Sequence, residues 1–307
     1  MALTGVLRPG FAQVRVLSME DALVHYRDRI GLNVVSTGDD GRVYMKAYDE
    51  FDHHSIVLRE CDEAGLDMMA FKVENEIALK EYEEKLLKEG IAVDHIAIGE
   101  QPGVGRRISF VAPTGHRFDL YAEMELSTKG PLVKNPDLWR TEPKGMKALR
   151  FDHCLLYGSD VDGTKKIFED ILGFTMTECI KEEDGTLIAI FLSCGNKAHD
   201  LALVRHEEDN KLHHVSFLVE DWTSIRDAAD IITRYDISRD IGPTRHGITR
   251  GQTIYFFDPS GNRNEVFSGG YSFYPGDPTR VWEMPNVGKA IFYYEQQLND
   301  RFMNVVT

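Results

Sequence analysis

Two histidines and one glutamate in the second half of the chain could together bind a metal ion. His153 and His214 each stand in a short apolar run typical of a β-strand, and Glu265 stands between Arg263 and two apolar residues. A charged carboxylate that is buried without a partner is costly, so burial of Glu265 would require a cation. Two imidazoles and one carboxylate form the facial arrangement that leaves coordination positions open on non-haem Fe(II). These residue types therefore indicate a metal centre that could take part in catalysis.

The alternative is that each histidine serves packing, as most histidines in strands do. No short motif links positions 153, 214 and 265 by their spacing. His213 directly precedes His214, and neighbouring residues of a strand face opposite sides of the sheet. We therefore expect only one of these two histidines to point inward.

His199 is the candidate for acid–base catalysis. It opens an expected strand, and imidazole titrates near neutral pH. Its counterpart in the repeat described below is His53, so a structural reason for both histidines stays open. Leu155 shares a strand face with His153, and Phe191 lies on the strand before His199, so both could form apolar walls of a substrate pocket. Ordinary core packing is the alternative for each.

An internal repeat organises the elements that must position these residues. Sliding the sequence by 146 positions aligns its two halves, and matches include Phe71 with Phe217 and Gly115 with Gly261. The first-half positions that correspond to the three candidate ligands are about Gln13, Met68 and Asp119. That set cannot build the same site. We therefore expect a single metal site, in the second half.

Each half is expected to contain two βαβββ modules, which makes the fold class α+β with two similar domains. Ser18-x-x-Asp21 and Ser159-x-x-Asp162 each open an amphipathic helix that ends at a glycine. Further signals in the second half predict helices at 162–172 and 222–234, and strands at 150–157, 174–181, 187–193, 199–205, 212–219, 253–258 and 263–268. The expected organisation is a domain at 1–130, a linker at 131–148 rich in Pro and Gly, a catalytic domain at 149–270 and an aromatic-rich tail at 271–307.

Length and charge exclude several classes of function. The 307 residues, of which 42% are hydrophobic, are enough for two folded domains. The 35 Lys and Arg against 50 Asp and Glu give a formal charge of −15, which repels nucleic acids and anionic membrane surfaces. The first residues lack the apolar core of a signal peptide, and no run is long enough to span a bilayer. We therefore expect a cytoplasmic protein that binds neither nucleic acid nor membrane.

Residues 244–265 resemble the signature of the extradiol ring-cleaving dioxygenases. The resemblance rests on His246, the pair Ile254-Tyr255, the turn Asp258-Pro259-x-Gly261 and the terminal Glu265. It covers essentially the whole chain, because the four βαβββ modules agree with the vicinal oxygen chelate, or glyoxalase-like, fold of that family.

The resemblance implies one Fe(II) per chain, bound by His153, His214 and Glu265. It also implies that His246 and Tyr255 hydrogen-bond the bound diolate or the oxygenated intermediates. The implied reaction is extradiol (meta) cleavage of catechol or substituted catechols by O2, which gives 2-hydroxymuconate semialdehyde in aromatic hydrocarbon degradation. The family resemblance further suggests a homotetramer.

Two alternatives keep the same fold. One is a glyoxalase-like metal isomerase, a class that lacks the His-Tyr-Asp-Pro-Gly-Glu series present here. The other is a non-catalytic module that binds a small aromatic molecule. Such a module would not need two histidines and a glutamate as ligands on one face.

Overall fold

The computed structural model describes residues 4–307, and its first half forms one mixed eight-stranded sheet in the order β2-β3-β4-β1-β5-β8-β7-β6. Helices and a π-helical continuation of α1 join these strands. The elements are β1 (Val6–Val16), α1 (Met19–Leu23), η1 (Val24–Ile30), β2 (Asn33–Thr37), β3 (Val43–Lys46), β4 (Ile56–Glu60), β5 (Gly65–Val73), α2 (Glu76–Lys88), β6 (Asp94–Ile96), β7 (Arg107–Val111) and β8 (Arg117–Tyr121).

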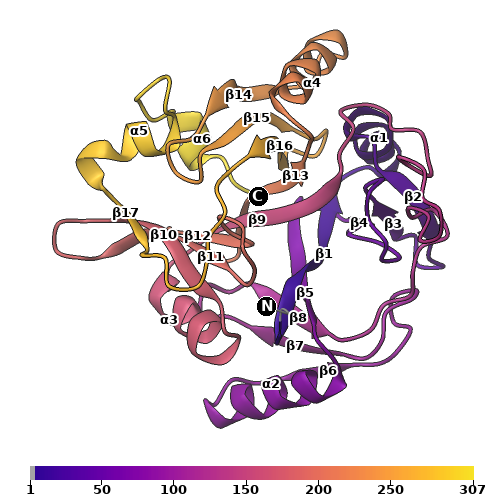
Figure 1. Cartoon of the computed structure of the whole chain (residues 1–307), viewed down its shortest axis with the longest axis horizontal. Helices are drawn as coiled ribbons and strands as arrows, with labels where there is room; N and C mark the ends of the chain where they lie inside the picture. Colours follow the sequence, from indigo (N-terminus) through magenta and orange to yellow (C-terminus); the bar gives the residue numbers. More distant parts are fainter. Residues whose placement is uncertain (1–3) are drawn as a thin grey trace.

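The second half forms a nine-stranded sheet in the order β14-β15-β16-β13-β9-β12-β11-β10-β17. Its elements are β9 (Arg150–Gly158), α3 (Val161–Lys166), η2 (Ile167–Ile171), β10 (Thr175–Lys181), β11 (Leu187–Ser193), β12 (Leu201–Arg205), β13 (Lys211–Leu218), α4 (Trp222–Arg234), β14 (Arg239–Arg245), β15 (Gly251–Phe257), β16 (Arg263–Gly269), β17 (Arg280–Glu283), η3 (Met284–Asn286), α5 (Val287–Ile291) and α6 (Asp300–Asn304). Figure 1 shows the two sheets side by side, with the first half in indigo to magenta.

The element order confirms the expected fold class of four βαβββ modules. Each module begins with a strand and a helix and continues with three strands, and the two modules of a half meet at β1–β5 or at β9–β13. Helix α4 has the predicted bounds. Ser18 caps α1 as predicted, because its side chain accepts a hydrogen bond from the backbone N–H of Asp21.

Three details of the sequence prediction were wrong. Asp160, not Ser159, caps α3, because its carboxylate accepts from the backbone N–H of Gly163 at 2.8 Å. His199 does not open a strand but lies in the loop before β12, which begins at Leu201. Strand β14 lacks an alternating apolar pattern and contains a proline, which explains why it was missed.

The two halves pack on each other through their helices. Tyr26 of η1 donates a hydrogen bond from its hydroxyl to Asp258 of the second half at 3.0 Å. A helix of the second half likewise contacts the first half. The ring centroid of Phe168 in η2 lies 5.9 Å from that of Phe71 and 4.9 Å from that of Phe118. One continuous apolar core therefore spans both sheets.

The segment at 271–307, in yellow in Figure 1, is built into the second half. Its strand β17 extends the sheet by parallel pairing with β10. At the chain end, Thr307 exchanges backbone hydrogen bonds with Leu212, at 2.7 and 3.0 Å. The segment is thus attached to the sheet at two strands, β10 and β13.

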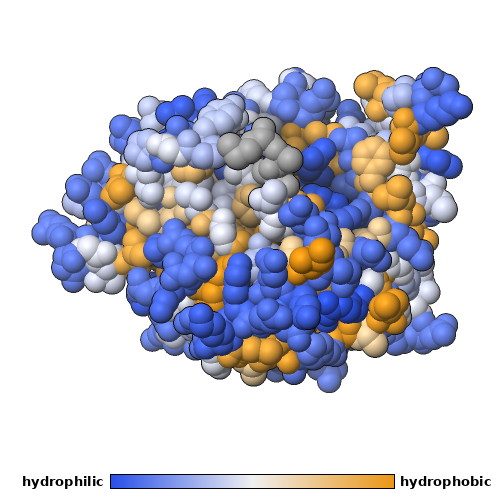
Figure 2. All heavy atoms as spheres, turned by 60° about the horizontal axis from the view of Figure 1, so that its bottom comes forward, coloured by the Kyte–Doolittle hydropathy of each residue, from blue (hydrophilic) through white to orange (hydrophobic). Residues whose placement is uncertain are grey.

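The face in Figure 2 is mainly hydrophilic, with hydrophobic side chains in separate small groups. Within residues 4–307, none of the helices combines the length and the apolar character that crossing a membrane requires.

Candidate metal centre and catalytic site

Three adjacent strands bring the candidate ligands together. His153 is on β9, His214 on β13 and Glu265 on β16, and β13 lies between the other two. Ser216 of β13 is the register partner of both His153 and Glu265. This register places the three side chains on one face of the sheet.

The ligand atoms form a tight triangle. Nε2 of His153 lies 3.1 Å from Oε2 of Glu265, Nε2 of His214 lies 3.4 Å from that same oxygen, and the two Nε2 atoms are 3.3 Å apart. Atoms at these separations share a point roughly 2 Å from each, which is the usual length of metal–nitrogen and metal–oxygen bonds. All three side chains are buried. The donor set therefore fits one metal ion with its remaining coordination positions free.

The charge of Glu265 is maintained by its neighbours. Burial alone would raise the pKa of this carboxyl, but its contacts with the imidazoles of His153, His214 and His246 hold it well below its usual range. The hydroxyls of Ser216 and Thr253 also donate to its two oxygens, at 2.6 and 2.5 Å. The carboxylate is thus ionised and fixed in orientation.

Asp152 and Lys197 hold His153 from behind. The Nδ1 atom of His153 lies 2.9 Å from Asp152, whose carboxylate also pairs with Lys197 at 2.9 Å. Burial would raise the pKa of Asp152, but Lys197 and His153 hold it well below its usual value. A carboxylate behind a ligand histidine fixes the ring so that its other nitrogen faces the metal. Sequence reasoning missed Asp152, although it directly precedes His153.

His199, His246 and Tyr255 surround the triangle. The ring of His199 lies on that of His153, with centroids 4.0 Å apart, and within residues 4–307 its Nδ1 atom has no hydrogen-bond partner. Burial lowers the pKa of His199 well below its usual value, so the imidazole is neutral. The hydroxyl of Tyr255 lies 2.8 Å from Nε2 of His246. Burial raises the pKa of Tyr255 well above its usual value, which keeps the phenol protonated.

A cavity of about 220 Å³ opens over these groups. Leu155 and Phe191 line it, as do further apolar residues that the sequence did not indicate, namely Ile248, Phe267, Ile291 and Phe302. The volume is below the roughly 300–1,000 Å³ that drug-sized ligands occupy, so the cavity suits a small molecule. Ile291 and Phe302 come from the C-terminal segment, whose aromatic content was the only sequence signal for a packed role.

Comparison with known proteins gives the family. Residues 66–125 match the family described as catechol 2,3-dioxygenase-like N-terminal domain, and residues 150–266 match the glyoxalase/bleomycin resistance protein/dioxygenase superfamily. The metapyrocatechase of Pseudomonas sp. (strain CF600) is 50% identical over 304 residues, which cover 99% of this chain and 99% of that protein. The chain belongs to the metapyrocatechase family of extradiol ring-cleaving dioxygenases.

Solved structures agree with this membership. The 2,3-dioxygenase LapB from Pseudomonas sp. KL28 is 44% identical with a TM-score of 0.90, and the match covers 93% of this chain and 100% of that one. Homoprotocatechuate 2,3-dioxygenase from Brevibacterium fuscum is 24% identical with a TM-score of 0.88, covering 99% and 93%. The second likeness bears on the fold alone. The family resemblance stated from residues 244–265 is therefore confirmed.

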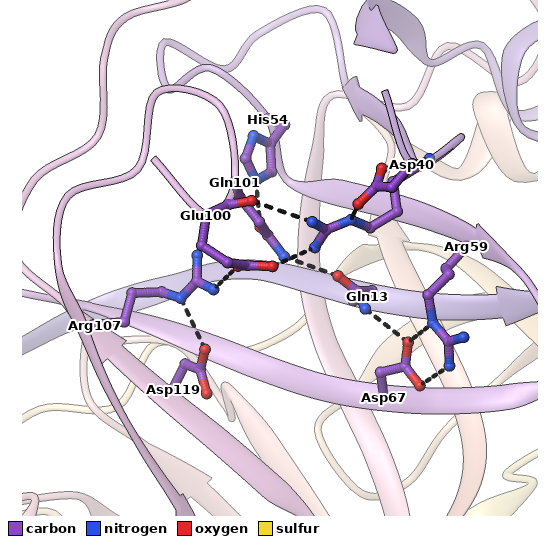
Figure 3. A network of polar contacts seen from close by, with 10 residues as sticks. Gln13, Asp40, His54, Arg59, Asp67, Glu100, Gln101, Arg107 and Asp119 are labelled. Atoms are coloured by element: carbon purple, nitrogen blue, oxygen red, sulfur yellow. Dashed lines mark hydrogen bonds and ion pairs between the residues drawn. The ribbon is translucent and has the colours of Figure 1, made fainter. Parts of the chain in front are cut away.

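In the first half, an arginine side chain lies where the second half has its ligand triangle. Strand registers pair Ser109 with Asp119 as they pair Tyr255 with Glu265, so Asp119 corresponds to Glu265. The Nε atom of Arg107 donates to Asp119 at 2.9 Å, and Figure 3 shows the guanidinium between Asp119 and Glu100. A fixed positive charge thus replaces a metal ion beside the buried carboxylate.

Two counterparts predicted from the sequence were wrong. The register of β1 and β5 pairs Phe11 with Ala70, as β9 and β13 pair His153 with Ser216, so Phe11 rather than Gln13 corresponds to His153. By the same comparison of β4 with β12, His54 rather than His53 corresponds to His199. The offset between the two halves is 142 at Phe11 and His153 (153 − 11), 145 at His54 and His199 (199 − 54) and 146 at Met68 and His214 (214 − 68), so chain segments of different length between the strands shift the alignment. Gln13 instead hydrogen-bonds Asp67 and Gln101, as Figure 3 shows.

We expect Arg107→Met to destabilise the first half by about 3–5 kcal/mol, because it leaves Asp119 buried without its cation. Denaturant unfolding followed by far-ultraviolet circular dichroism measures the change. The double variant Arg107→Met/Asp119→Leu removes both charges and should recover most of the loss. Wild-type stability of the single variant would show that the ion pair is not needed.

The prediction that only one of His213 and His214 points inward was also wrong. Both side chains are buried, with exposed fractions of 1% and 2%. The ladder between β9 and β13 shifts register between Leu212 and His214, which breaks the strict alternation of faces. His213 therefore packs beneath the C-terminal segment while His214 faces Glu265.

Proposed function

We propose that this chain opens the ring of catechol with O2 beside the diol and gives 2-hydroxymuconate semialdehyde. Both oxygen atoms enter the product, so the reaction needs no other oxidant or reductant. The observation that carries the proposal is the convergence of His153, His214 and Glu265 to 3.1–3.4 Å at the base of a small apolar cavity. The family membership supports the same reaction.

Fe(II) is the proposed cofactor, one per chain, held by these three side chains on one side. When bound, a ferrous ion supplies open coordination positions and the redox chemistry that lets a diol react with O2. The side chains of the site contribute binding, orientation and proton transfer. Asp152 holds His153 in place, and the hydroxyls of Ser216 and Thr253 hold Glu265 in place.

His199 is the proposed acid–base catalyst. Its neutral ring lines the cavity, and its Nδ1 atom is free of partners within residues 4–307, so it can take a proton from a catechol hydroxyl and return it later. Tyr255 is protonated and can donate a hydrogen bond to a diolate oxygen. In the free protein Nε2 of His246, 2.8 Å from the Tyr255 hydroxyl, accepts this hydrogen bond, and a bound diolate oxygen would take its place as the acceptor.

The apolar walls define the substrate class. Leu155, Phe191 and Ile248 come from the sheet and its loops, and Ile291 and Phe302 from the C-terminal segment. They can enclose an aromatic ring, while His199, His246 and Tyr255 offer polar groups beside the ligand triangle. Catechol and catechols with small substituents fit this distribution.

Anaerobic reconstitution tests the proposal. Iron-free protein is loaded with Fe(II), mixed with catechol, and exposed to air while the visible absorbance of the ring-opened product is followed. We expect colour only when catechol, O2 and iron are all present, and a parallel sample with Mn(II) compares the two metals. Iron-loaded protein that gives no colour would leave the isomerase or the binding module as the function.

We expect Zn(II) to occupy the site and give inactive protein. Zinc accepts the same nitrogen and oxygen ligands and binds them at least as tightly as Fe(II), but it has no redox chemistry. Metal content by atomic spectroscopy, measured beside catechol turnover, checks this. Full turnover by zinc protein free of iron would contradict the proposed role of the metal.

We also infer a homotetramer that works in the cytoplasm. The first rests on the family resemblance, and the second on the four cysteines, which are all free thiols as expected in a reducing compartment. Analytical ultracentrifugation of the metal-loaded protein measures the subunit number, and a monomer would contradict the inference.

A further inference from the structure

His213 connects the candidate ligand His214 to the C-terminal segment. The Nδ1 atom of His213 lies 2.7 Å from Nδ1 of His214. On the other side of the same ring, Nε2 lies 2.7 Å from the backbone carbonyl oxygen of Phe302 in α6. Both histidines are buried, so water does not replace either contact.

These contacts determine where the ring protons lie. A carbonyl oxygen only accepts, so Nε2 of His213 must carry a proton. The short contact between the two Nδ1 atoms needs one proton between them. If Nε2 of His214 offers its lone pair to a metal ion, its own proton is on Nδ1, and Nδ1 of His213 is then the acceptor.

We infer that His213 is a positioning residue, which together with the Phe302 carbonyl holds His214 in the tautomer that can bind the metal ion. This inference rests on the proposed function. The contact chain runs from the Phe302 carbonyl through His213 to His214, and ends at the ligand triangle. Without the acceptor on His213, the buried Nδ1–H of His214 would have no partner, and the tautomer with its proton on Nε2 would compete.

The structure fixes His213 firmly in this place. Its ring stacks on Tyr157, with centroids 5.0 Å apart, and meets the edge of Phe302 at 4.6 Å. Arg263 donates to the backbone carbonyl of His213 at 3.1 Å and to that of Val305 at 2.7 Å. The guanidinium thus ties the strand of His213 to the segment that carries the Phe302 carbonyl.

His153 and His246 follow the same rule. Nδ1 of His153 faces the carboxylate of Asp152, which only accepts. Nδ1 of His246 hydrogen-bonds the backbone carbonyl of Ile291, again from the C-terminal segment. Each ring therefore directs its Nδ1–H away from the triangle and its Nε2 towards it. The C-terminal segment supplies the acceptor for His246 directly and fixes the tautomer of His214 through His213.

Two substitutions at position 213 separate this role from packing. His213→Asn places its amide oxygen near the former Nδ1, so it keeps an acceptor for His214 but loses the aromatic ring. His213→Phe keeps the ring between Tyr157 and Phe302 but offers no acceptor. The probe is Co(II), titrated into metal-free protein against a competing chelator, with its visible spectrum as a measure of the ligand set.

We expect His213→Phe to bind Co(II) about 10–100-fold more weakly than the wild type, as is typical when a group behind a metal ligand is removed. His213→Asn should bind within a few-fold of the wild type and keep the wild-type spectrum. Thermal melting of the metal-free proteins should show the opposite order, with Phe more stable than Asn. That split is the signature of a positioning role.

A packing role predicts that Co(II) affinity follows stability, with Phe near the wild type and Asn weak, and that result would overturn the inference. Equal affinity in all three proteins would overturn it too. If His213→Asn does not fold, His213→Gln replaces it. Gln keeps a donor for the Phe302 carbonyl but no acceptor at Nδ1, so it should bind as weakly as Phe, and wild-type binding by Gln would overturn the inference. Wild-type protein that binds no Co(II) or iron would instead refute the proposed function.

Discussion

Replacing Glu265 by glutamine is expected to give a folded chain that does not retain iron or cleave catechol. The amide has the shape of the carboxylate but no charge, and in either orientation its NH2 group faces one of the two hydroxyls, of Ser216 or Thr253, that donate to the carboxylate. The loss of metal affinity should exceed about 100-fold, because even groups behind a ligand are worth about 10–100-fold. Iron per chain after anaerobic loading and desalting measures it.

Glu178→Gln is the matched control. Its carboxylate is as buried as that of Glu265, with exposed fractions of 1% and 2%, but it accepts from a backbone N–H, a tyrosine hydroxyl and an indole N–H. This variant should retain iron at the wild-type ratio. A Glu265→Gln protein that holds as much iron as the control would end the ligand assignment.

His199→Asn is expected to bind iron and catechol but to turn over about 10²–10⁴-fold more slowly. That range is typical for removal of a positioned acid–base group. The ring lies against His153 without forming part of the ligand triangle, so its removal should spare the metal. Steady-state kcat and KM with catechol, together with iron content, separate proton transfer from binding.

The exposed His95 gives the control for this substitution. Its side chain is 63% exposed and pairs with Glu83, far from the cavity lining. His95→Asn should therefore keep the wild-type kcat. If kcat of His199→Asn stayed within a few-fold of the wild type, the proton would have to move through another group of the cavity, and His246 is the nearest in kind.

The repeat and the residue types were enough to predict the strands that carry the site. His153 and His214 each occupy the fourth position of their strand, and Glu265 follows the turn that Asp258 and Gly261 form. An apolar run, a turn with Pro and Gly and a buried carboxylate are local signals. The structure agrees with these signals because the alternation of apolar and polar residues also determines the register of the sheet.

Features that depend on irregular strands or on distant chain contacts could not be predicted. A single sequence offset does not show where residues are inserted between strands, so Gln13 was taken in place of Phe11 as the counterpart of His153. A β-bulge likewise has no mark in the offset, and both histidines of the pair at 213–214 proved buried. The cavity walls at Ile291 and Phe302 come from a segment outside the repeat. Its docking depends on tertiary contacts that no local pattern encodes.

The guanidinium of Arg107 beside Asp119 suggests how a second centre could be engineered into this chain. Ring and thioether side chains, from Phe11 and Met68, stand where the second half has its imidazoles. Histidines at those two places and threonine in place of Arg107 would recreate the donor pattern on a backbone that already has the right register. The two similar halves could then each hold a metal ion, and the metal affinities of the two sites could be compared within one chain.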